Sequence, residues 1–267
     1  MNSNKTTKDN PAAFQKVQPI TLLMILKKTA RKLISYQLKA AINFFKSELL
    51  NYFCKYKIKN KFYCNLCKFE TPFFLNTANE KKILYNSICP NCSSRKRHRG
   101  LYEIYKNILK KTNSPRILHF APEPVFYNLF KSLQYITADL ELTDVDLKLD
   151  IEKIDHVSNS FDIILCNHVL EHVSDDNKAL KELYRLLAPS GTAIITVPGV
   201  WERNDIIKYE KPNGNGHHRD YGLEFINILD QIFNTVKSID LYQYNNVYKL
   251  SIGLTPNHDL VFLCKKD

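Results

Sequence analysis

The sequence lacks long hydrophobic runs and, over a long central stretch, glycine. No apolar run approaches the ~20 residues of a membrane span. The longest run near the start, residues 20–26, is followed at once by Lys27 and Lys28, with no small-residue cleavage site. Without an export signal, we expect a cytoplasmic protein with reduced cysteines. The length of 267 residues has room for one sizeable core and a small accessory module.

Acidic residues are scarce in the first part of the chain. Residues 1–111 hold 23 Lys and Arg against 5 Asp and Glu, whereas residues 112–267 hold 15 against 22. Such a basic segment can meet nucleic acid, an anionic membrane surface or the protein's own acidic half. Residues 19–53 repeat apolar side chains at helical spacing. We expect a helix or helix pair docked on the main domain; the alternative is a basic amphipathic helix making peripheral contact with an anionic membrane.

Two CxxC pairs, Cys64 with Cys67 and Cys89 with Cys92, are separated by 21 residues. Each short turn lets two thiolates approach one ion, so the two pairs supply four ligands for a closed tetrahedral Zn²⁺ site. A closed site predicts a structural rather than a catalytic zinc. Four unrelated buried cysteines or a redox pair is the alternative, but a redox CxxC is not expected twice.

A basic run, SSRKRHRG, occupies residues 93–100 directly after the second pair. Its cations would offset the negative charge of a four-thiolate zinc centre, or they could bind phosphate. RNA binding favours aromatic residues interleaved with basic ones for stacking, and residues 95–99 contain none.

Residues 161–198 have the pattern of a buried strand, a loop, a helix, a Pro-Ser-Gly turn and a second buried strand. The connection is long enough for a crossover helix, so the two strands should be parallel neighbours. Asn167, His168, Glu171 and His172 follow the first strand. Ligands of open α/β sheets bind at the carboxyl ends of the strands, so this polar cluster is a candidate site.

An earlier strand-helix-strand pattern precedes that region. Residues 116–120 form a short apolar strand, and the prolines of residues 121–124 open a helix. A second strand ends in Asp139, 20 residues beyond His119, which is the spacing of a ribose-binding acid in nucleotide-binding βαβ units. Asp150 is another acidic position, near the end of DVDLKLDI at residues 144–151. Either aspartate alone could equally belong to a solvated turn.

From about Arg116 to its end, the chain resembles the class I S-adenosylmethionine-dependent methyltransferases, and most closely the methyltransferase type 11-like branch. The resemblance rests on FDIILCNHVLEHV and LYRLLAPSGTAIITVP. It implies an α/β fold with a Rossmann-like, seven-stranded, mostly parallel sheet whose last strand is antiparallel. Residues 235–242 and 259–265 fit the final two strands. We expect a basic helical extension over 1–58, a zinc-ribbon-like module over 59–100 and the methyltransferase domain over 101–267.

The resemblance also implies roles for residues that match the family's positions. Asp139 would bind the ribose of S-adenosylmethionine, while Asp150 and Ile151 would lie against the adenine. Asn167 and His168 would lie near the methionine part and the transferred methyl. The remaining predicted cofactor contacts are Phe120, Ala121, Glu123 and Leu140.

One departure from the family concerns the first loop, which is usually rich in glycine. Here it reads HFAPE, and no glycine occurs between Gly100 and Gly191. Ala121 and Glu123 occupy the glycine positions. We therefore expect the backbone to run differently or the cofactor to lie farther out, with Glu123 answering the cofactor's ammonium group.

Methyl transfer is mainly a matter of alignment, although a general base helps when the nucleophile is a hydroxyl or an amine. Candidate catalytic residues are His168, His172 and His218. Residues 201–216 are expected to form a mobile loop, with Arg219 after it as a fork for an anionic or sugar-like acceptor. No motif for a catalytic metal is found in residues 112–267.

Three functions remain open. The first is a methyltransferase acting on a small molecule or on a sugar of a glycan, with a structural zinc. The second is an RNA methyltransferase that uses the basic front and the zinc module to hold RNA. The third is a non-catalytic zinc-ribbon binding protein with a degenerate Rossmann-like domain.

Overall fold

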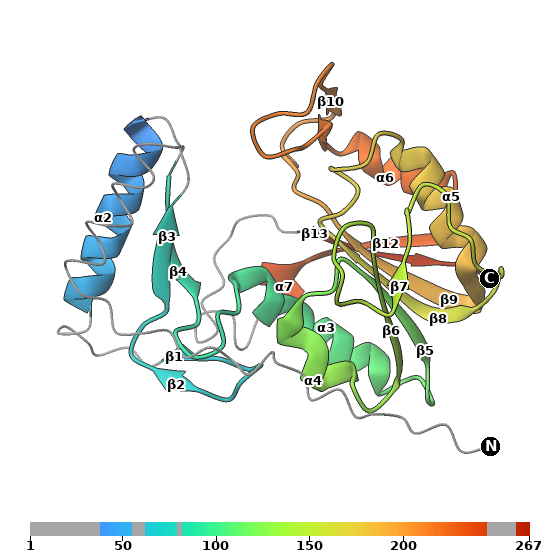
Figure 1. The fold of residues 1–267 in the computed structure, drawn as a ribbon, viewed down its shortest axis with the longest axis horizontal. Coiled ribbons are helices and arrows are strands. Elements are labelled where there is room, and N and C mark those ends of the chain that lie inside the picture. Colours follow the sequence, from blue (N-terminus) through green and yellow to red (C-terminus); the bar gives the residue numbers. More distant parts are fainter. Residues whose placement is uncertain (1–37, 55–61, 79–81, 245–259) are drawn as a thin grey trace. The chain divides into compact units, whose positions relative to one another are not determined.

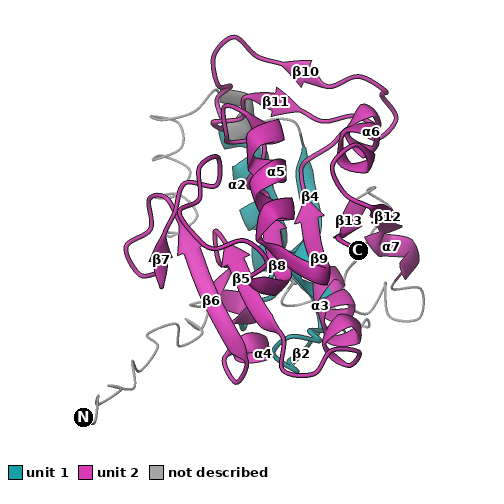
Figure 2. Ribbon diagram, turned by 90° about the vertical axis from the view of Figure 1, so that its right-hand side faces the viewer, with its two compact units in different colours: residues 1–99, 250–253 teal, residues 100–249, 254–267 magenta. Residues whose placement is uncertain are grey.

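The computed structural model describes residues 38–54, 62–78, 82–244 and 260–267, and Figure 1 shows it as a ribbon. The described residues divide into two compact units between Arg99 and Gly100, coloured separately in Figure 2. The first part of the predicted helical segment, residues 19–37, lies outside the described residues. The three-part division at residues 58 and 100 stays a prediction.

The first unit combines one helix with short antiparallel strand pairs. It contains α2 (Leu38–Cys54), β1 (Phe62–Tyr63), β2 (Glu70–Thr71), β3 (Leu75–Ala78) and β4 (Ile83–Ile88). β1 pairs with β2, and β3 pairs with β4. α2 packs on β3 and β4, and the Asn51 side chain exchanges hydrogen bonds of 2.9 and 2.6 Å with the backbone of Asn76.

These contacts place the described part of the basic helical segment on the hairpin of its own unit, whereas the sequence suggested docking on the main domain. Contact of this segment with an anionic membrane stays a prediction. Among the described helices, none has both the length and the apolar character needed to cross a bilayer.

The second unit is built on a seven-stranded sheet, in the order β12-β13-β9-β8-β5-β6-β7. The strands from β9 to β7 in that order run parallel, and β13 runs antiparallel to both of its neighbours. The predicted sheet, including its antiparallel last strand, is therefore confirmed. The strands are β5 (Arg116–Phe120), β6 (Gln134–Asp139), β7 (Leu147–Lys148), β8 (Phe161–Asn167), β9 (Leu187–Thr196), β12 (Thr235–Asp240) and β13 (Leu260–Lys265).

Helices lie on both faces of this sheet (Figure 1). α5 (Asp176–Leu186) and α6 (Glu224–Asp230) lie on one face, and α3 (Lys96–Leu109) and α4 (Tyr127–Phe130) lie on the other. On the first face, Leu180 and Phe225 share a buried core cluster with Ile164. β8 is buried on both faces, which is why its sequence shows a continuous apolar run instead of alternation. A four-residue helix, α7 (Leu241–Tyr244), follows β12.

The segment after β5 is less helical than its sequence pattern predicts. A 3₁₀ turn, η1 (Pro124–Phe126), leads into α4, which has only four residues. Of the apolar side chains in this segment, Phe126 and Phe130 are buried. The helix stops early because β6 begins at Gln134, so only a short connection is needed.

Candidate functional site

The predicted cofactor contacts gather along one edge of the sheet, at the carboxyl ends of four adjacent parallel strands. Each lies at, or within three residues of, a strand end: Phe120, Ala121 and Glu123 at β5, Asp139 and Leu140 at β6, Asp150 and Ile151 beyond β7, and Asn167 and His168 at β8. The strand order changes direction between β5 and β8, since β6 and β7 extend the sheet to one side and β9 to the other. Open α/β sheets bind ligands at such a point.

The two aspartates of this edge differ in exposure. Asp139 is half-buried, and its Oδ1 accepts hydrogen bonds of 2.7 and 2.8 Å from the backbone of Glu141 and Leu142. Within the described part of the chain, its Oδ2 has no hydrogen bond, so one oxygen remains for a ligand. Asp150 is exposed and accepts a 2.9 Å bond from the backbone of Glu152.

Two of the predicted contacts are core residues. Phe120 is 2% exposed and Ile151 is 5% exposed, and both belong to the main core cluster. They can offer a ligand only a small part of their surface. Leu140, beside Asp139, is by contrast well exposed.

Asn167 is the centre of a buried hydrogen-bond network. Its amide donates to the Tyr105 hydroxyl at 2.8 Å and to Glu123 Oε2 at 2.9 Å. Its Oδ1 accepts from the Thr196 hydroxyl at 3.2 Å and lies 3.1 Å from the Tyr105 hydroxyl. Because the side-chain amide of Asn167 is already hydrogen-bonded to these groups, Asn167 positions the Glu123 carboxylate.

The glycine-poor loop adopts a backbone conformation that glycine favours. Ala121 has φ +48°, in the left-handed region, and its N–H donates to the carbonyl of Ala138 at 2.9 Å. A non-glycine residue there costs roughly 1–2 kcal/mol. At this position the backbone thus has the handedness expected of a glycine, and the substitution is accommodated by strain.

Beyond β8, a group of histidines surrounds a buried carboxylate. Glu171 is 1% exposed, and its Oε1 lies 3.3 Å from His168 Nδ1 and 3.9 Å from His172 Nε2. His172 packs edge-to-face on His217, with ring centroids 4.9 Å apart. Burial lowers the pKa of His217; the Glu171 carboxylate opposes this shift, and the neighbouring His172 adds to it.

The predicted His218 contributes its backbone to this group. Its N–H donates to the Glu171 carbonyl at 2.7 Å, whereas the side chain that joins the group belongs to His217. From the sequence alone, either of two adjacent histidines could face Glu171, and only the folded backbone decides which side chain does. Here β11 (Arg219–Asp220) pairs with β10 (Ile207–Lys208), which gives the expected mobile loop a short hairpin.

The prediction that Arg219 forms a fork for an anionic acceptor is wrong. Its side chain is 4% exposed, and its guanidinium donates to the carbonyls of Leu170 at 2.7 Å and Ser174 at 2.8 Å. Asp176 Oδ2 lies 3.6 Å from Arg219 Nε. The residue therefore fixes the loop between β8 and α5, and no sequence signal distinguished this role from anion binding.

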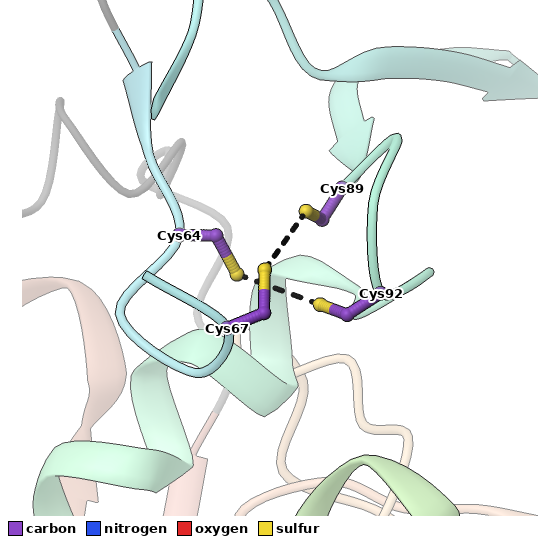
Figure 3. A group of neighbouring side chains, drawn as sticks. All are labelled: Cys64, Cys67, Cys89 and Cys92. Atoms are coloured by element: carbon purple, nitrogen blue, oxygen red, sulfur yellow. Dashed lines mark hydrogen bonds between the residues drawn. The ribbon is translucent and has the colours of Figure 1, made fainter. Parts of the chain in front are cut away.

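The four predicted zinc ligands converge in the first unit (Figure 3). Cys64 Sγ lies 3.6 Å from Cys92 Sγ, and Cys67 Sγ lies 3.7 Å from Cys89 Sγ. Sulfurs at about 2.3 Å from a tetrahedral Zn²⁺ are about 3.8 Å apart, so the spacing suits such an ion. Hydrogen bonds from the other three thiols hold the pKa of Cys64 well below its ordinary value, and Cys64 raises that of Cys89.

The two CxxC turns share one backbone pattern that the sequence did not reveal. Lys68 N–H donates to the Cys64 carbonyl at 2.8 Å, and Ser93 N–H donates to the Cys89 carbonyl at 2.9 Å. In return, Cys64 and Cys89 each donate at 2.9 Å to a carbonyl five residues later. Lys68 and Ser93 both have φ near +60°, at 61° and 59°. Each pair is therefore shaped by a closed local turn.

Arg99 lies behind the cysteine cluster and is fully buried. Its guanidinium stacks 3.9 Å from the Phe74 ring centroid and donates to the carbonyls of Ser94, Asn86 and Ser87. Burial lowers the pKa of Arg99 and the four cysteines partly oppose this shift, which gives a net pKa of about 10. The side chain therefore stays charged at neutral pH. It can offset thiolate charge, as the sequence suggested for the basic run.

Comparison with known families identifies the central part of the second unit. A family model described as "Methyltransferase domain" matches residues 127–195. This range includes β6, β8, α5 and nearly all of β9. The match confirms the predicted methyltransferase domain, and with it the prediction that the chain is a methyltransferase. No curated protein matches the chain significantly.

Several solved structures are similar to the chain. A SAM-dependent methyltransferase from Archaeoglobus fulgidus has a TM-score of 0.46 at 17% identity, covering 65% of this chain and 95% of the other. One from Mesorhizobium loti has a TM-score of 0.46 at 12% identity, covering 64% and 100%. The 1,6-didemethyltoxoflavin-N1-methyltransferase of Burkholderia thailandensis, with bound S-adenosylhomocysteine, has a TM-score of 0.45 at 16% identity, covering 64% and 78%. Similarity at this level carries no information about the acceptor of this chain.

Proposed function

We propose that this chain transfers a methyl group from S-adenosylmethionine to a small molecule or to a sugar of a glycan. One observation carries the proposal. Glu123, Asp139 and the His168–Glu171 pair lie at the carboxyl ends of β5, β6 and β8, around the point where the strand order changes direction. Three carboxylates and an imidazole at such an edge suit a charged nucleoside cofactor on one side and a nucleophile on the other.

The residues present suit the cofactor's parts. Asp139 Oδ2 can accept a ribose hydroxyl, and the exposed Asp150 can accept from the adenine amino group. Glu123, held by Asn167 at 2.9 Å, offers a carboxylate to the ammonium group. When bound, S-adenosylmethionine supplies an electrophilic methyl on a sulfonium centre.

His168 is the residue best suited to act as a general base. Glu171 Oε1 holds its Nδ1 at 3.3 Å, which leaves Nε2 for a proton from a hydroxyl or amine nucleophile. A carboxylate behind an imidazole also stabilises the protonated ring. The His168 side chain is 29% exposed while Glu171 is 1% exposed, so the imidazole can reach an acceptor from a fixed support.

The small-molecule or glycan acceptor is favoured over RNA because residues 95–99 of the basic run contain no Phe, Tyr or Trp for stacking on bases. In addition, Arg99 of this run is enclosed within the first unit and cannot contact phosphates, whereas Arg95 is exposed and Lys96 and Arg97 are half-buried. RNA remains an outcome of the transfer experiment. In that experiment, tritiated methyl groups are followed from the cofactor into cell extract separated into RNA, protein, glycan and small molecules; label in RNA would overturn this choice.

Cofactor binding is tested by calorimetry. Asp139→Ala should weaken S-adenosylmethionine binding about tenfold, the scale of one lost charge-assisted hydrogen bond. Asp144→Ala is the matched control, because Asp144 is an exposed acid in the same segment. If the unmutated protein does not bind the cofactor, the non-catalytic binding protein becomes the better interpretation.

We also propose that Cys64, Cys67, Cys89 and Cys92 bind one structural Zn²⁺. Sulfur spacing near that of a tetrahedral site supports this. Cys64→Ser should lose the metal and unfold the first unit, because in such small modules the free energy of metal binding supplies the free energy of folding. Ser93→Ala, an exposed neighbour, is the control for metal content. Full stability of the metal-free protein would refute the structural role.

A further inference from the structure

We propose that Glu171, His172 and His217 form a second metal site, for a divalent transition-metal ion, at the carboxyl end of β8. One possible ligand atom from each residue lies within 4.8 Å of the other two. Metal–ligand bonds of about 2.0–2.2 Å place neighbouring ligand atoms roughly 3–4 Å apart, so small side-chain movements would close the site. No sequence motif shows it, because His217 follows His172 by 45 residues.

The His172 imidazole is oriented in the way that metal ligands usually are, and an acidic side chain lies near the His217 ring. His172 Nδ1 lies 3.2 Å from the Gly216 carbonyl, and His217 Nδ1 lies 3.9 Å from Asp220 Oδ1. A metal-binding histidine generally donates one ring N–H to a carbonyl or carboxylate and coordinates through the other nitrogen. Nε2 is therefore the available ligand atom of His172, and either ring nitrogen of His217 can serve.

The carboxylate of Glu171 gives an independent reason for a cation. It is almost fully buried, and its Oε2 has no hydrogen-bond partner among the described residues. A buried oxygen of an ionised group is costly when it is unpaired. His168 approaches only Oε1, at 3.3 Å. A divalent ion beside Glu171 would supply the missing compensation.

The protein backbone holds the three ligands in place. His218 N–H donates to the Glu171 carbonyl at 2.7 Å, which ties the loop of His217 to the loop of Glu171 and His172. Arg219 fixes the same loop through the Leu170 carbonyl at 2.7 Å. Rigid support of this kind is what a preorganised metal site needs.

The donor set indicates the class of ion. Two imidazole nitrogens and one carboxylate oxygen suit zinc and neighbouring first-row ions better than magnesium or calcium. Three protein ligands leave a coordination position open, unlike the closed four-cysteine site. That position would take water or a hydroxyl oxygen of the acceptor, a consequence that rests on the proposed function.

Cobalt(II) titration of the full-length protein tests the site and separates it from the cysteine cluster. The unmutated chain should bind about two ions, of which only one shows thiolate-to-cobalt charge-transfer absorption. His172→Ala and His217→Ala should each remove the ion that lacks this absorption and keep the thiolate-bound one. His218→Ala should keep both ions, because the His218 side chain is adjacent in sequence but does not belong to the proposed site.

Two results would overturn the inference. One is an unmutated chain that binds cobalt only through thiolates, which would mean that Glu171, His172 and His217 do not form a metal site. The other is full retention of the second ion in the folded double variant His172→Ala, His217→Ala. Cofactor calorimetry on the same samples keeps the two proposals apart, because a protein that takes both ions but does not bind S-adenosylmethionine contradicts the proposed function alone.

Discussion

The buried arginine behind the cysteine cluster offers the sharpest stability test. Arg99→Met keeps much of the side-chain length against Phe74 and removes the guanidinium. Three carbonyl groups, of Ser94, Asn86 and Ser87, lose a charged donor. The negative charge of the cysteine cluster loses its buried counter-charge as well.

The size of the effect follows from these contacts. Removing one partner of a buried charge pair costs about 3–5 kcal/mol, and the desolvation of Arg99 itself is recovered, which favours the lower end. We therefore expect about 3 kcal/mol of lost stability in the first unit. Since about 1.4 kcal/mol corresponds to a factor of ten, zinc affinity should fall about a hundredfold if that loss falls on the metal-bound state.

Urea unfolding and competition with a zinc chelator measure the two quantities. Arg99→Lys should fall between the wild type and Arg99→Met, because an ammonium keeps the charge but cannot stack on Phe74 or reach all three carbonyls. Arg95→Met, on the exposed side of the same basic run, is the control. The reasoning is refuted if Arg99→Met and Arg95→Met unfold at the same urea concentration and bind zinc equally well.

Two further substitutions test the second unit. Tyr105→Phe removes the hydroxyl that contacts Asn167 and should cost about 1–2 kcal/mol in urea unfolding, with weaker cofactor binding; Tyr102→Phe on the same helix is the control, and equal stability of the two variants would contradict the network. Arg116 holds the pKa of Asp162 below its ordinary value, chiefly through their side-chain hydrogen bonds. A lowered folded-state pKa contributes stability above the unfolded pKa that is lost as the pH falls through the folded pKa, so Asp162→Asn should flatten the stability curve below about pH 4. Because both side chains are more than a third exposed, at 42% and 37%, the effect should stay under about 1 kcal/mol; an unchanged acid limb would contradict it.

The fold could be predicted from the sequence where a local pattern has one physical solution. A continuous apolar run such as β8, followed by an amphipathic helix and another apolar run, can bury its surface only as parallel neighbours in a covered sheet. The CxxC spacing likewise predicts that the four thiols converge, as they do. These patterns need no knowledge of distant parts of the chain.

The rest depended on contacts between distant segments. Whether Arg219 points to solvent or to the Leu170 carbonyl depends on how the hairpin folds back, and the sequence contains no signal for it. The choice of His217 over His218 depends on the same hairpin. α4 stops early because of the position of β6, although its apolar spacing would allow a longer helix.

The repeated turn of the two CxxC pairs has a consequence for how the first unit folds. Each turn closes within six residues, so it can form on its own in well under a millisecond. The proposed Zn²⁺ would then have only to join two preformed turns across the 21 residues that separate Cys67 from Cys89. Closing such a loop costs about 3 kcal/mol, and doubling its length adds only about 0.6 kcal/mol. The rate of metal capture should thus depend little on the length of the segment between the turns.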